Sequence, residues 1–562
     1  MPDAVTEPGR PGVTGEEVDV VVVGAGFAGL YALYRLRELG LRARVFEAGD
    51  DVGGTWYWNR YVGARCDTNS LFYCYSFSDE LRAEWRWAER YPARSELLAY
   101  LRHVADRFDL RKDIRFATRI TRAEYDEPAN RWSVTTHAGE RIRARFVVTA
   151  VGCLSDVQVP AFPGLDSFAG EWFHTARWPD PPADFRGQRV GVIGTGSSGV
   201  QVIPEIAREA LHLTVFQRTP NYVLPARNAP LDPEAIRQAY ADPSSLRQRI
   251  RRSSAGIPIE HPTRAAMDLS PEDRERVYQE RWDRGGVAEF LFAFSDLRSD
   301  TAANQTASDF IRSKIREIVR DPVTAELLCP KLPLGAKRTQ LGTDYYETFN
   351  RDNVELVDVS QTPIRAIDRD GVWVGERHQP LTQLVFATGF DAMTGALLEI
   401  DIRGRCGQTL RERWGNGPRT YLGLATSGFP NLFMLTGPGS PSVLGNVVVA
   451  IEQHVEWVTD LLRYAQRAGV ELAEARRDAE DGWVEHVNEL GRRSIISTGN
   501  SWYLGANIPG KPRVFLPYAG GYDRYRAICD AVARKGYEGF DLAPRRTVGP
   551  GRPGPAGDPA AA

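Results

Sequence analysis

Residues 18–29 read Val18-Asp-Val-Val-Val-Val23 followed by Gly24-Ala-Gly26-Phe-Ala-Gly29, and this stretch decides the fold class. Its apolar run predicts a strand that is buried on both faces of a parallel sheet. The GxGxxG spacing then predicts a tight turn that leads into a helix over residues 30–39. Such a turn presents free backbone amides at a helix N-terminus, where a pyrophosphate can bind. The stretch therefore predicts a dinucleotide-binding βαβ unit.

A second stretch of the same kind begins about 170 residues later. Its strand is Arg189-Val-Gly-Val-Ile193, its turn is Gly194-Thr-Gly196-Ser-Ser-Gly199, and a helical pattern runs from there towards Ala210. Each turn follows a strand and precedes a helix, which is the context that a dinucleotide-binding turn requires. We therefore expect an α/β fold with two Rossmann-type dinucleotide-binding domains.

The residues that end the second strand of each unit distinguish the two ligands. Glu47 stands where a carboxylate can accept hydrogen bonds from a ribose diol, which suits FAD. Arg218 and Thr219 stand at the matching place in the second unit. A cation and a hydroxyl there can bind a 2′-phosphate, so the second unit is expected to prefer NADPH, with a solvated surface charge as the alternative interpretation of Arg218.

Composition limits the remaining possibilities. A chain of 562 residues is expected to form two or three packed units. Lys plus Arg is 70 and Asp plus Glu is 73, so the net charge of -3 gives no reason to expect a nucleic-acid or membrane partner. Six scattered cysteines without a CxxC spacing argue against a zinc site or a disulfide framework, and no metal is expected. The N-terminal residues resemble no targeting signal and no apolar run can span a bilayer, which predicts a cytoplasmic protein.

The predicted domain organisation follows the two turns. Residues 225–329 carry charged, Arg-rich helical patterns and no glycine turn, so they are expected to form a helical insertion. Both chain ends are rich in Pro and Gly, which is typical of disorder. The predicted bounds are a disordered N-terminus over 1–17, an FAD-binding domain over 18–153 and 387–545, an NADP-binding domain over 154–224 and 330–386, the insertion over 225–329, and a disordered tail over 546–562.

The segment after the first unit indicates which flavin chemistry to expect. Flavoprotein disulfide reductases carry a redox-active cysteine pair there, whereas residues 53–67 of this chain carry aromatic side chains instead. That class is excluded, and oxygen becomes the natural acceptor of the electrons. Thr55 and Trp56, in this segment, are expected to be among the cofactor-binding residues.

A sequence motif between the two units resembles the signature of a known family. Phe168-Ala-Gly170-Glu-Trp-Phe-His174-Thr-Ala-Arg-Trp178-Pro179 resembles the FxGxxxHxxxWP signature of type I Baeyer-Villiger monooxygenases at every fixed position. Flavin monooxygenases that oxidise nitrogen or sulfur carry a related motif without the Trp-Pro ending. Stretches such as FQRTPNYVLPARN and SWYLGANIPGKPR are similar to the phenylacetone monooxygenase branch. The resemblance covers about residues 18–545.

The resemblance implies roles for individual residues. It makes Arg338 the catalytic residue, with Asp67 orienting its guanidinium, and Lys337 a second contact to the 2′-phosphate. Trp502 matches a tryptophan on a loop that closes over NADP, with simple core packing as the alternative. Ser442, Val443 and Leu444 match a loop that shapes ketone specificity. His174 is expected either to couple the two nucleotide units or to be a structural histidine.

Together these expectations predict an NADPH- and oxygen-dependent flavin monooxygenase. The resemblance implies that a C4a-peroxyflavin inserts one oxygen next to a ketone carbonyl and yields an ester or lactone. Ketone and oxygen are the expected partners, and nothing in the sequence specifies an oligomeric state. The nearer alternative is a flavin monooxygenase that oxidises amines or sulfides. A non-enzymatic nucleotide-binding or redox-sensing protein is disfavoured by the presence of Asp67, Lys337 and Arg338.

Overall fold

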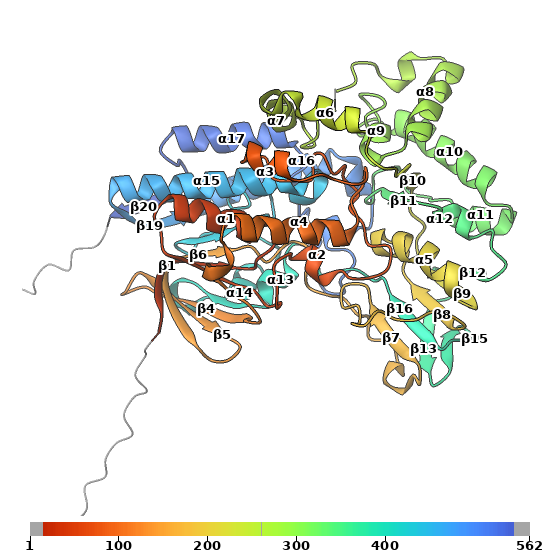
Figure 1. The fold of residues 1–562 in the computed structure, drawn as a ribbon, viewed down its shortest axis with the longest axis horizontal. Helices are drawn as coiled ribbons and strands as arrows, with labels where there is room; N and C mark the ends of the chain where they lie inside the picture. The colour runs from red at the N-terminus through yellow and green to blue at the C-terminus, as the bar shows by residue number, and fades with distance from the viewer. Residues whose placement is uncertain (1–14, 260, 545–562) are drawn as a thin grey trace, which may run out of the picture.

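Two parallel-rich sheets organise the chain, and they lie side by side in the computed structural model (Figure 1). The structure describes residues 15–259 and 261–544. Of the segments predicted to be disordered, 1–14 and 546–562 lie outside the described residues. Glu17, within the predicted N-terminal segment, already begins the first strand.

The first sheet has eight strands in the order β17-β4-β5-β6-β1-β2-β3, with β18 also paired to β6. Strand β1 runs parallel to β2 and β6, and Val20 and Val22 on it are completely buried, as an unbroken apolar run predicts. The strands are β1 (Glu17–Val23), β2 (Ala43–Phe46), β3 (Ile114–Arg115), β4 (Ile120–Asp126), β5 (Arg131–Thr136), β6 (Arg141–Thr149), β17 (Asp401–Arg403) and β18 (Leu432–Met434).

Helices cover the upper side of this sheet as drawn in Figure 1. They are α1 (Phe27–Glu38), α4 (Arg94–Arg107), α15 (Val447–Ala468) and α17 (Tyr522–Arg534). The long helix α15 packs against both α1 and α17, and its buried residues join those of β1 and α1 in the largest apolar cluster. A late segment of the chain therefore completes the first unit.

The second sheet has the order β12-β9-β8-β16-β7, and every pair in it is parallel. Helix α5 (Ser197–Glu209) follows β8 directly after the second glycine turn. The strands are β7 (Glu171–His174), β8 (Arg189–Ile193), β9 (His212–Gln217), β12 (Val354–Asp358) and β16 (Gln383–Phe386). An antiparallel sheet of β13 (Ile364–Asp368), β14 (Gly371–Val374) and β15 (Arg377–Pro380) lies beside them.

The segment predicted to be a helical insertion is helical. It lies at the upper right of Figure 1 and runs between β10 (Val223–Pro225) and β11 (Gln340–Gly342), which pair with each other. Its helices are α6 (Pro233–Ala241), α7 (Pro243–Arg252), α8 (Pro271–Arg284), α9 (Val287–Leu291), α10 (Thr301–Ile318) and α11 (Pro322–Leu328).

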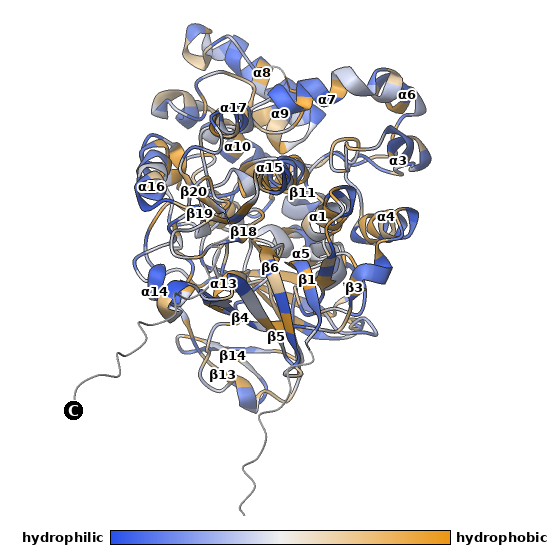
Figure 2. Ribbon diagram, turned by 90° about the vertical axis from the view of Figure 1, so that its left-hand side faces the viewer, coloured by the Kyte–Doolittle hydropathy of each residue, from blue (hydrophilic) through white to orange (hydrophobic). Residues whose placement is uncertain are grey.

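The remaining α-helices and strands are distributed along the described chain. They are α2 (Thr55–Trp58), α3 (Asp79–Glu84), α12 (Tyr345–Thr348), α13 (Gly395–Leu398), α14 (Leu410–Arg413), α16 (Arg477–Arg492), and the paired strands β19 (Val470–Ala475) and β20 (Phe540–Pro544). The short outer helix α3, with the sequence DELRAE, is mainly hydrophilic (Figure 2). Within the described residues, no helix is both long and apolar enough to cross a bilayer.

Candidate active site

The first glycine turn joins β1 to α1 and tolerates no larger side chain. Gly24 has a φ of +105°, which side chains rarely adopt, and a Cβ on it would lie 2.6 Å from the carbonyl oxygen of Ala150. A Cβ on Gly29 would lie 1.8 Å from the carbonyl oxygen of Gly24. Gly26 is the N-cap of α1 and lies close to the backbone of Gly54. A Cβ on Gly26 would lie 3.3 Å from the Cα of Gly54. The turn thus brings backbone close to the helix N-terminus, as pyrophosphate binding requires.

Glu47 lies directly behind this turn, at the end of β2. Its buried carboxylate accepts hydrogen bonds from the backbone N–H of Ala25 (2.7 Å) and of Gly49 (2.8 Å). A carboxylate has about four lone-pair positions, so two remain for the ribose hydroxyls that the sequence predicts. The residue therefore supports the turn.

Thr55 and Trp56 begin α2, beside the first turn. Thr55 is exposed, whereas Trp56 is buried and its indole N–H has no acceptor among the described residues. The ring of Trp56 meets that of Tyr73 edge-on at 5.9 Å. A buried donor without an acceptor fits a site that binds a polar cofactor, because such donors are otherwise paired. The first unit therefore has the features that FAD needs.

Arg338 and Asp67 form the ion pair that the resemblance predicts. The guanidinium donates from Nη2 (2.5 Å) and Nε (3.2 Å) to the same Asp67 carboxylate oxygen, and from Nη1 to the carbonyl oxygen of Val443 (3.0 Å). The negative charge of Asp67 raises the pKa of Arg338 further above its already high value, against the opposing effect of burial. The guanidinium is therefore a fixed and permanently charged group.

The predicted specificity loop lies next to this pair. Ser442 and Val443 are buried and Leu444 is half-buried, in the short helical turn that precedes α15. Val443 packs in an apolar cluster with Met393, Tyr503 and Leu516, and Leu444 and Trp502 pack against that cluster. The sequence did not identify Met393, Tyr503 or Leu516, because single apolar residues in irregular segments carry no periodic signal.

The second glycine turn repeats the geometry of the first. Gly194 has a φ of +108°, and a Cβ on Gly199 would lie 2.2 Å from the carbonyl oxygen of Gly194. A Cβ on Gly196 would meet no atom within 4 Å, so open space lies before the N-terminus of α5. This space can admit phosphates to the free amides of the helix.

A pocket of about 580 Å³ adjoins the predicted 2′-phosphate residues. Thr219 and Lys337 line it, and burial with help from the nearby Arg218 charge lowers the pKa of Lys337. Arg218 itself is exposed and does not line the pocket. Ser497, Asn500 and Arg513 also line the pocket, and Arg513 donates to the Asn500 side chain at 3.0 Å. Those three wall residues were not predicted, since the segment around Trp502 has no motif for a phosphate.

The signature residues lie on and around β7, the edge strand of the second sheet. His174 ends β7, is 2% exposed, and accepts from the backbone N–H of Ala176 at 3.0 Å through Nδ1. Its Nε2 has no partner among the described residues, and its ring lies 6.3 Å from that of Phe390. Burial, together with the charge of Arg177, lowers its pKa to about 4. His174 therefore contacts the segment that follows β16.

The other signature residues pack the second unit. Phe168 is buried in the apolar cluster of β16 and the antiparallel sheet, and Trp178 is buried against Tyr61 and Phe185. A Cβ on Gly170 would lie 2.1 Å from the carbonyl oxygen of Thr382, so this position requires glycine for close packing. Pro179 follows Trp178 and is half-buried. The motif thus acts mainly through packing.

Comparison with known proteins identifies the family. Residues 17–230 match the flavin-binding monooxygenase-like family. The chain is 44% identical to a Baeyer-Villiger monooxygenase of Pseudooceanicola batsensis, over 93% of this chain and 96% of the relative. It is also 44% identical to the phenazine N-monooxygenase PhzNO1 of Lysobacter antibioticus, over 93% and 97%. A solved structure of oxidised steroid monooxygenase bound to NADP matches with 52% identity and a TM-score of 0.89, over 94% of this chain and 99% of that one.

The chain belongs to the Baeyer-Villiger monooxygenase family. Membership confirms the predicted fold class and the predicted activity, which is NADPH- and oxygen-dependent insertion of oxygen next to a ketone carbonyl. It also confirms FAD and NADP as the cofactors of this Baeyer-Villiger monooxygenase. The roles of individual site residues and the domain bounds stay predictions.

Proposed function

We propose that Arg338, held by Asp67, is the group that stabilises negative charge during oxygen transfer to a ketone. The observation that carries this proposal is the three hydrogen bonds by which Asp67 and the Val443 carbonyl fix the guanidinium. FAD, reduced by NADPH, supplies the oxygen chemistry. A cation 4 Å from a developing negative charge contributes about 4 kcal/mol at an effective dielectric of about 20, or roughly a thousandfold in rate.

The two cofactors are assigned to the two glycine turns. FAD would bind Gly24, Gly26, Gly29, Glu47, Thr55 and Trp56 in the unit formed by residues 18–153 and 387–545. NADPH would bind Gly194, Gly196, Gly199, Arg218, Thr219 and Lys337 in the unit formed by 154–224 and 330–386, with 225–329 as the helical insertion. Support comes from the steric need for glycine in both turns and from the pocket beside Thr219 and Lys337. Trp502 would close over NADP.

The substrate class follows from the surroundings of Arg338. Val443, Met393 and Leu516 form a buried apolar cluster beside the guanidinium, and Leu444 packs against it. Apolar surroundings of this kind suit a ketone with an apolar body. The solved relative at 52% identity is named a steroid monooxygenase. We therefore propose aryl, cyclic and polycyclic ketones as the substrates to test first.

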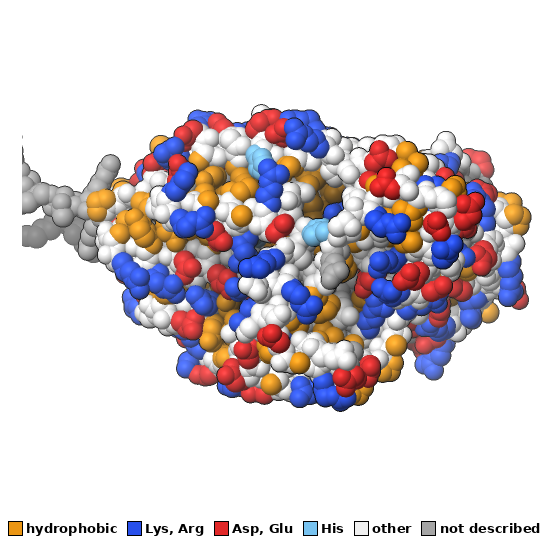
Figure 3. Space-filling view, turned by 90° about the horizontal axis from the view of Figure 1, so that it is seen from above, with side chains coloured by type: hydrophobic (Ala, Val, Ile, Leu, Met, Phe, Trp, Pro, Cys, Tyr) orange, Lys and Arg blue, Asp and Glu red, His pale blue; other side chains and the backbone are white. Residues whose placement is uncertain are grey.

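The partners proposed are a small ketone and molecular oxygen, in a cytoplasmic protein. Basic and acidic side chains alternate on the face shown in Figure 3, and no broad field of one sign covers that face. Nucleic acids bind to extended basic surfaces, so this pattern supports a small-molecule enzyme.

The test is to separate the two half-reactions in an Arg338→Ala variant. Anaerobic reduction of bound FAD by NADPH is expected to continue within a few-fold of the wild-type rate, while ester formation falls by roughly a thousandfold. Arg338→Lys is the matched variant, since it keeps a charge but loses the fork that binds Asp67 and Val443 together. Ester formation by Arg338→Ala at the wild-type rate would exclude the proposed role.

Oxidation of amines is the second candidate function, favoured by the relative named as a phenazine N-monooxygenase. Ketones need a nucleophilic oxygen and amines an electrophilic one, so only the ketone reaction should depend strongly on the Arg338 charge. Turnover of amines or sulfides that greatly exceeds turnover of every ketone tested would favour this candidate.

A further inference from the structure

The backbone of Arg338 is held separately from its side chain. Its carbonyl oxygen accepts two hydrogen bonds, one from Nδ2 of Asn221 (2.7 Å) and one from Nε2 of Gln340 (2.9 Å). A carbonyl oxygen has two lone pairs, so both of its acceptor positions are used. Asp67 and the Val443 carbonyl hold the guanidinium at the other end. Arg338 is therefore fixed at both ends.

Gln340 has a defined position at the start of β11, where it is 5% exposed. The Arg338 carbonyl can only accept, so the NH₂ group of the Gln340 amide must face it. The Oε1 atom of the amide then accepts from the hydroxyl of Ser197. The backbone N–H of Gln340 donates to the carbonyl of Tyr222 at 2.8 Å. Both ends of the amide are thus used.

The hydroxyl that binds Gln340 belongs to the second glycine turn. Ser197 follows Gly196 and is the first residue of α5. The N-terminus of this helix is where we propose that the phosphates of NADPH bind. Ser197 and Gln340 therefore join the proposed NADPH site to the backbone of Arg338.

Helix α5 also holds the segment that carries Asp67. Gln201 lies four residues after Ser197, on the same face of the helix. Its amide donates to the Arg65 carbonyl at 3.0 Å and accepts from the Arg65 backbone N–H at 3.3 Å. Arg65 precedes Asp67 by two residues. One face of α5 thus contacts, directly or through Gln340, the segments of both charged residues.

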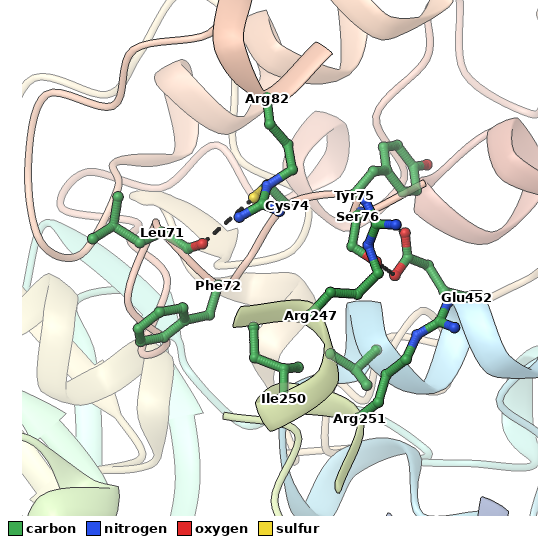
Figure 4. Close-up of a pocket in the computed structure, with 11 residues that line it drawn as sticks. Leu71, Phe72, Cys74, Tyr75, Ser76, Arg82, Arg247, Ile250, Arg251 and Glu452 are labelled. Atoms are coloured by element: carbon green, nitrogen blue, oxygen red, sulfur yellow. Dashed lines mark hydrogen bonds between the residues drawn. The ribbon is translucent and has the colours of Figure 1, made fainter. Parts of the chain in front are cut away.

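The Asp67 segment has further support on its other side. Ser76 follows Asp67 by nine residues, and both its backbone N–H and its hydroxyl donate to Glu452 of α15, each at 2.6 Å (Figure 4). Asp67 thus has support that does not depend on α5. Arg338 is the member of the pair whose position a change at Gln340 should alter.

We propose that Gln340 is a positioning residue, which holds Arg338 where its charge stabilises oxygen transfer. The inference rests on the proposed role of Arg338 and on the proposed binding of NADPH at the second turn. Loss of one carbonyl hydrogen bond allows the Arg338 backbone to shift, and a charge that moves away from the reacting atoms stabilises them less. Reduction of the flavin needs no such charge, so it should not depend on Gln340.

The ratio of ester to hydrogen peroxide tests this role. Gln340→Met keeps a similar length but removes both the donor and the acceptor. At saturating NADPH, the ratio should fall by about tenfold, on the order of the loss of one hydrogen bond, while anaerobic reduction of bound FAD stays within about twofold of the wild-type rate. An unchanged ratio in Gln340→Met would overturn the proposal.

Gln383→Met is the matched control. Gln383 is also 5% exposed, lies on β16 of the second sheet, and donates to the Glu171 side chain at 3.2 Å. This variant should lower the melting temperature, as Gln340→Met does, but keep the wild-type ratio. An equal fall of the ratio in both variants would mean that loss of any buried amide has this effect, and would reject the role of Gln340.

A double variant separates this role from that of Arg338. If Gln340 acts through Arg338, Gln340→Met should not reduce ester formation further in an Arg338→Ala background. A further fall of about tenfold there would show that Gln340 acts independently of Arg338. Ester formation by Arg338→Ala at the wild-type rate rejects the proposed function itself. Loss of ester formation in Arg338→Ala with an unchanged ratio in Gln340→Met rejects only the role of Gln340.

Ser197→Ala keeps the test independent of whether Gln340→Met folds. Ser197 is exposed, and the substitution removes the hydroxyl that donates to Gln340. At saturating NADPH, the ratio should fall by about two- to fivefold with flavin reduction unchanged. A wild-type ratio in Ser197→Ala would reject the connection from α5 to Arg338.

A crystal structure of Gln340→Met provides a readout that does not depend on activity. The Arg338 guanidinium should be displaced from Asp67 or should occupy more than one position. A guanidinium that keeps its hydrogen bonds to Asp67 and to the Val443 carbonyl would contradict the proposal.

Discussion

At the scale of single residues, the site depends on charges that are held in place by neutral groups as well as by acids. Arg338 is fixed on one side by the carboxylate of Asp67 and on the other by the backbone carbonyl of Val443. A substitution at Val443 leaves that carbonyl in place, so it would alter the apolar surface without removing the hydrogen bond. The proposed role of Val443 in specificity can therefore be tested separately from the proposed role of Arg338 in catalysis.

Lys337 tests the predicted discrimination between NADPH and NADH. Lys337→Ala removes one charge from the pocket wall beside Thr219. A charge-assisted contact to phosphate contributes about 1.5–3 kcal/mol, so kcat/KM for NADPH should fall by roughly ten- to a hundredfold while that for NADH changes little. Steady-state kinetics with both cofactors measures this ratio.

The control for that experiment is Lys331→Ala, which removes an exposed lysine from the same segment. It should leave both values unchanged. If kcat/KM falls equally with NADPH and NADH in Lys337→Ala, Lys337 does not bind the 2′-phosphate.

His174 makes a prediction about pH. Burial lowers its pKa to about 4 in the folded protein, against about 6.5 in an unfolded chain. Between these values the unfolded state binds more protons, so the free energy of unfolding falls as the pH drops from about 6.5 to 4. Between pH 7 and pH 5, the free energy of unfolding should therefore fall by about 1 to 2 kcal/mol less in His174→Gln than in the wild type.

Urea unfolding at the two pH values measures that difference. The exposed His137→Gln is the control and should retain the wild-type pH dependence. If His174→Gln loses as much stability as the wild type between pH 7 and pH 5, the histidine is not held neutral in the folded state.

At the scale of elements, the two strand-turn-helix units share one geometry, although we propose a different ligand for each. In both turns the carbonyl oxygen of the first glycine lies too close to the third glycine for a side chain. A Cβ on Gly29 or on Gly199 would lie 1.8 Å or 2.2 Å from that oxygen, respectively. The difference lies in the residues that follow the next strand, Glu47 in one unit and Arg218 in the other. Each unit can therefore be disabled by itself.

Alanine substitutions at the third glycines test that independence. Gly29→Ala should give protein with little bound FAD, because the turn must shift to relieve the contact. Gly199→Ala should keep FAD but raise the KM for NADPH by at least tenfold, on the order of the 1–3 kcal/mol that overpacking costs. Absorbance of the bound flavin and steady-state kinetics report the two effects.

Gly482→Ala is the matched control, since this helical glycine has no atom within 4 Å of a Cβ. It should retain both cofactors with wild-type affinity. Loss of FAD from Gly199→Ala and retention in Gly29→Ala would reverse the assignment of the two units.

The elements that could be predicted are those whose signal is local. The run from Val18 to Val23 specifies a buried strand, and the glycine spacing specifies the turn and the start of α1. The wall formed by Asn500 and Arg513 could not be predicted in the same way. These residues lie in irregular chain that Lys511 fastens to Asp391 and to the Ala392 carbonyl, so their position depends on contacts over more than a hundred residues.

At the scale of the whole molecule, the proposed reaction centre is assembled from distant parts of the chain. Arg338 lies 271 residues from Asp67 and 105 from Val443. The pairing of Arg338 with Asp67 was available only through resemblance to a family, because residue types and spacing do not specify contacts at such separations. The hydrogen bond from Arg338 to the Val443 carbonyl could not be predicted either, because every residue has a backbone carbonyl whatever its side chain.

The insertion of oxygen next to a ketone carbonyl is best tested by the product that the protein forms from a ketone under ¹⁸O₂. FAD-loaded protein is supplied with NADPH and a panel of aryl, cyclic and polycyclic ketones, and the products are weighed by mass spectrometry while NADPH loss and hydrogen peroxide are followed. We expect an ester or lactone that contains one ¹⁸O atom for each NADPH consumed. NADPH consumption that yields only hydrogen peroxide with every ketone, together with labelled oxygen on an amine or sulfide, would contradict it.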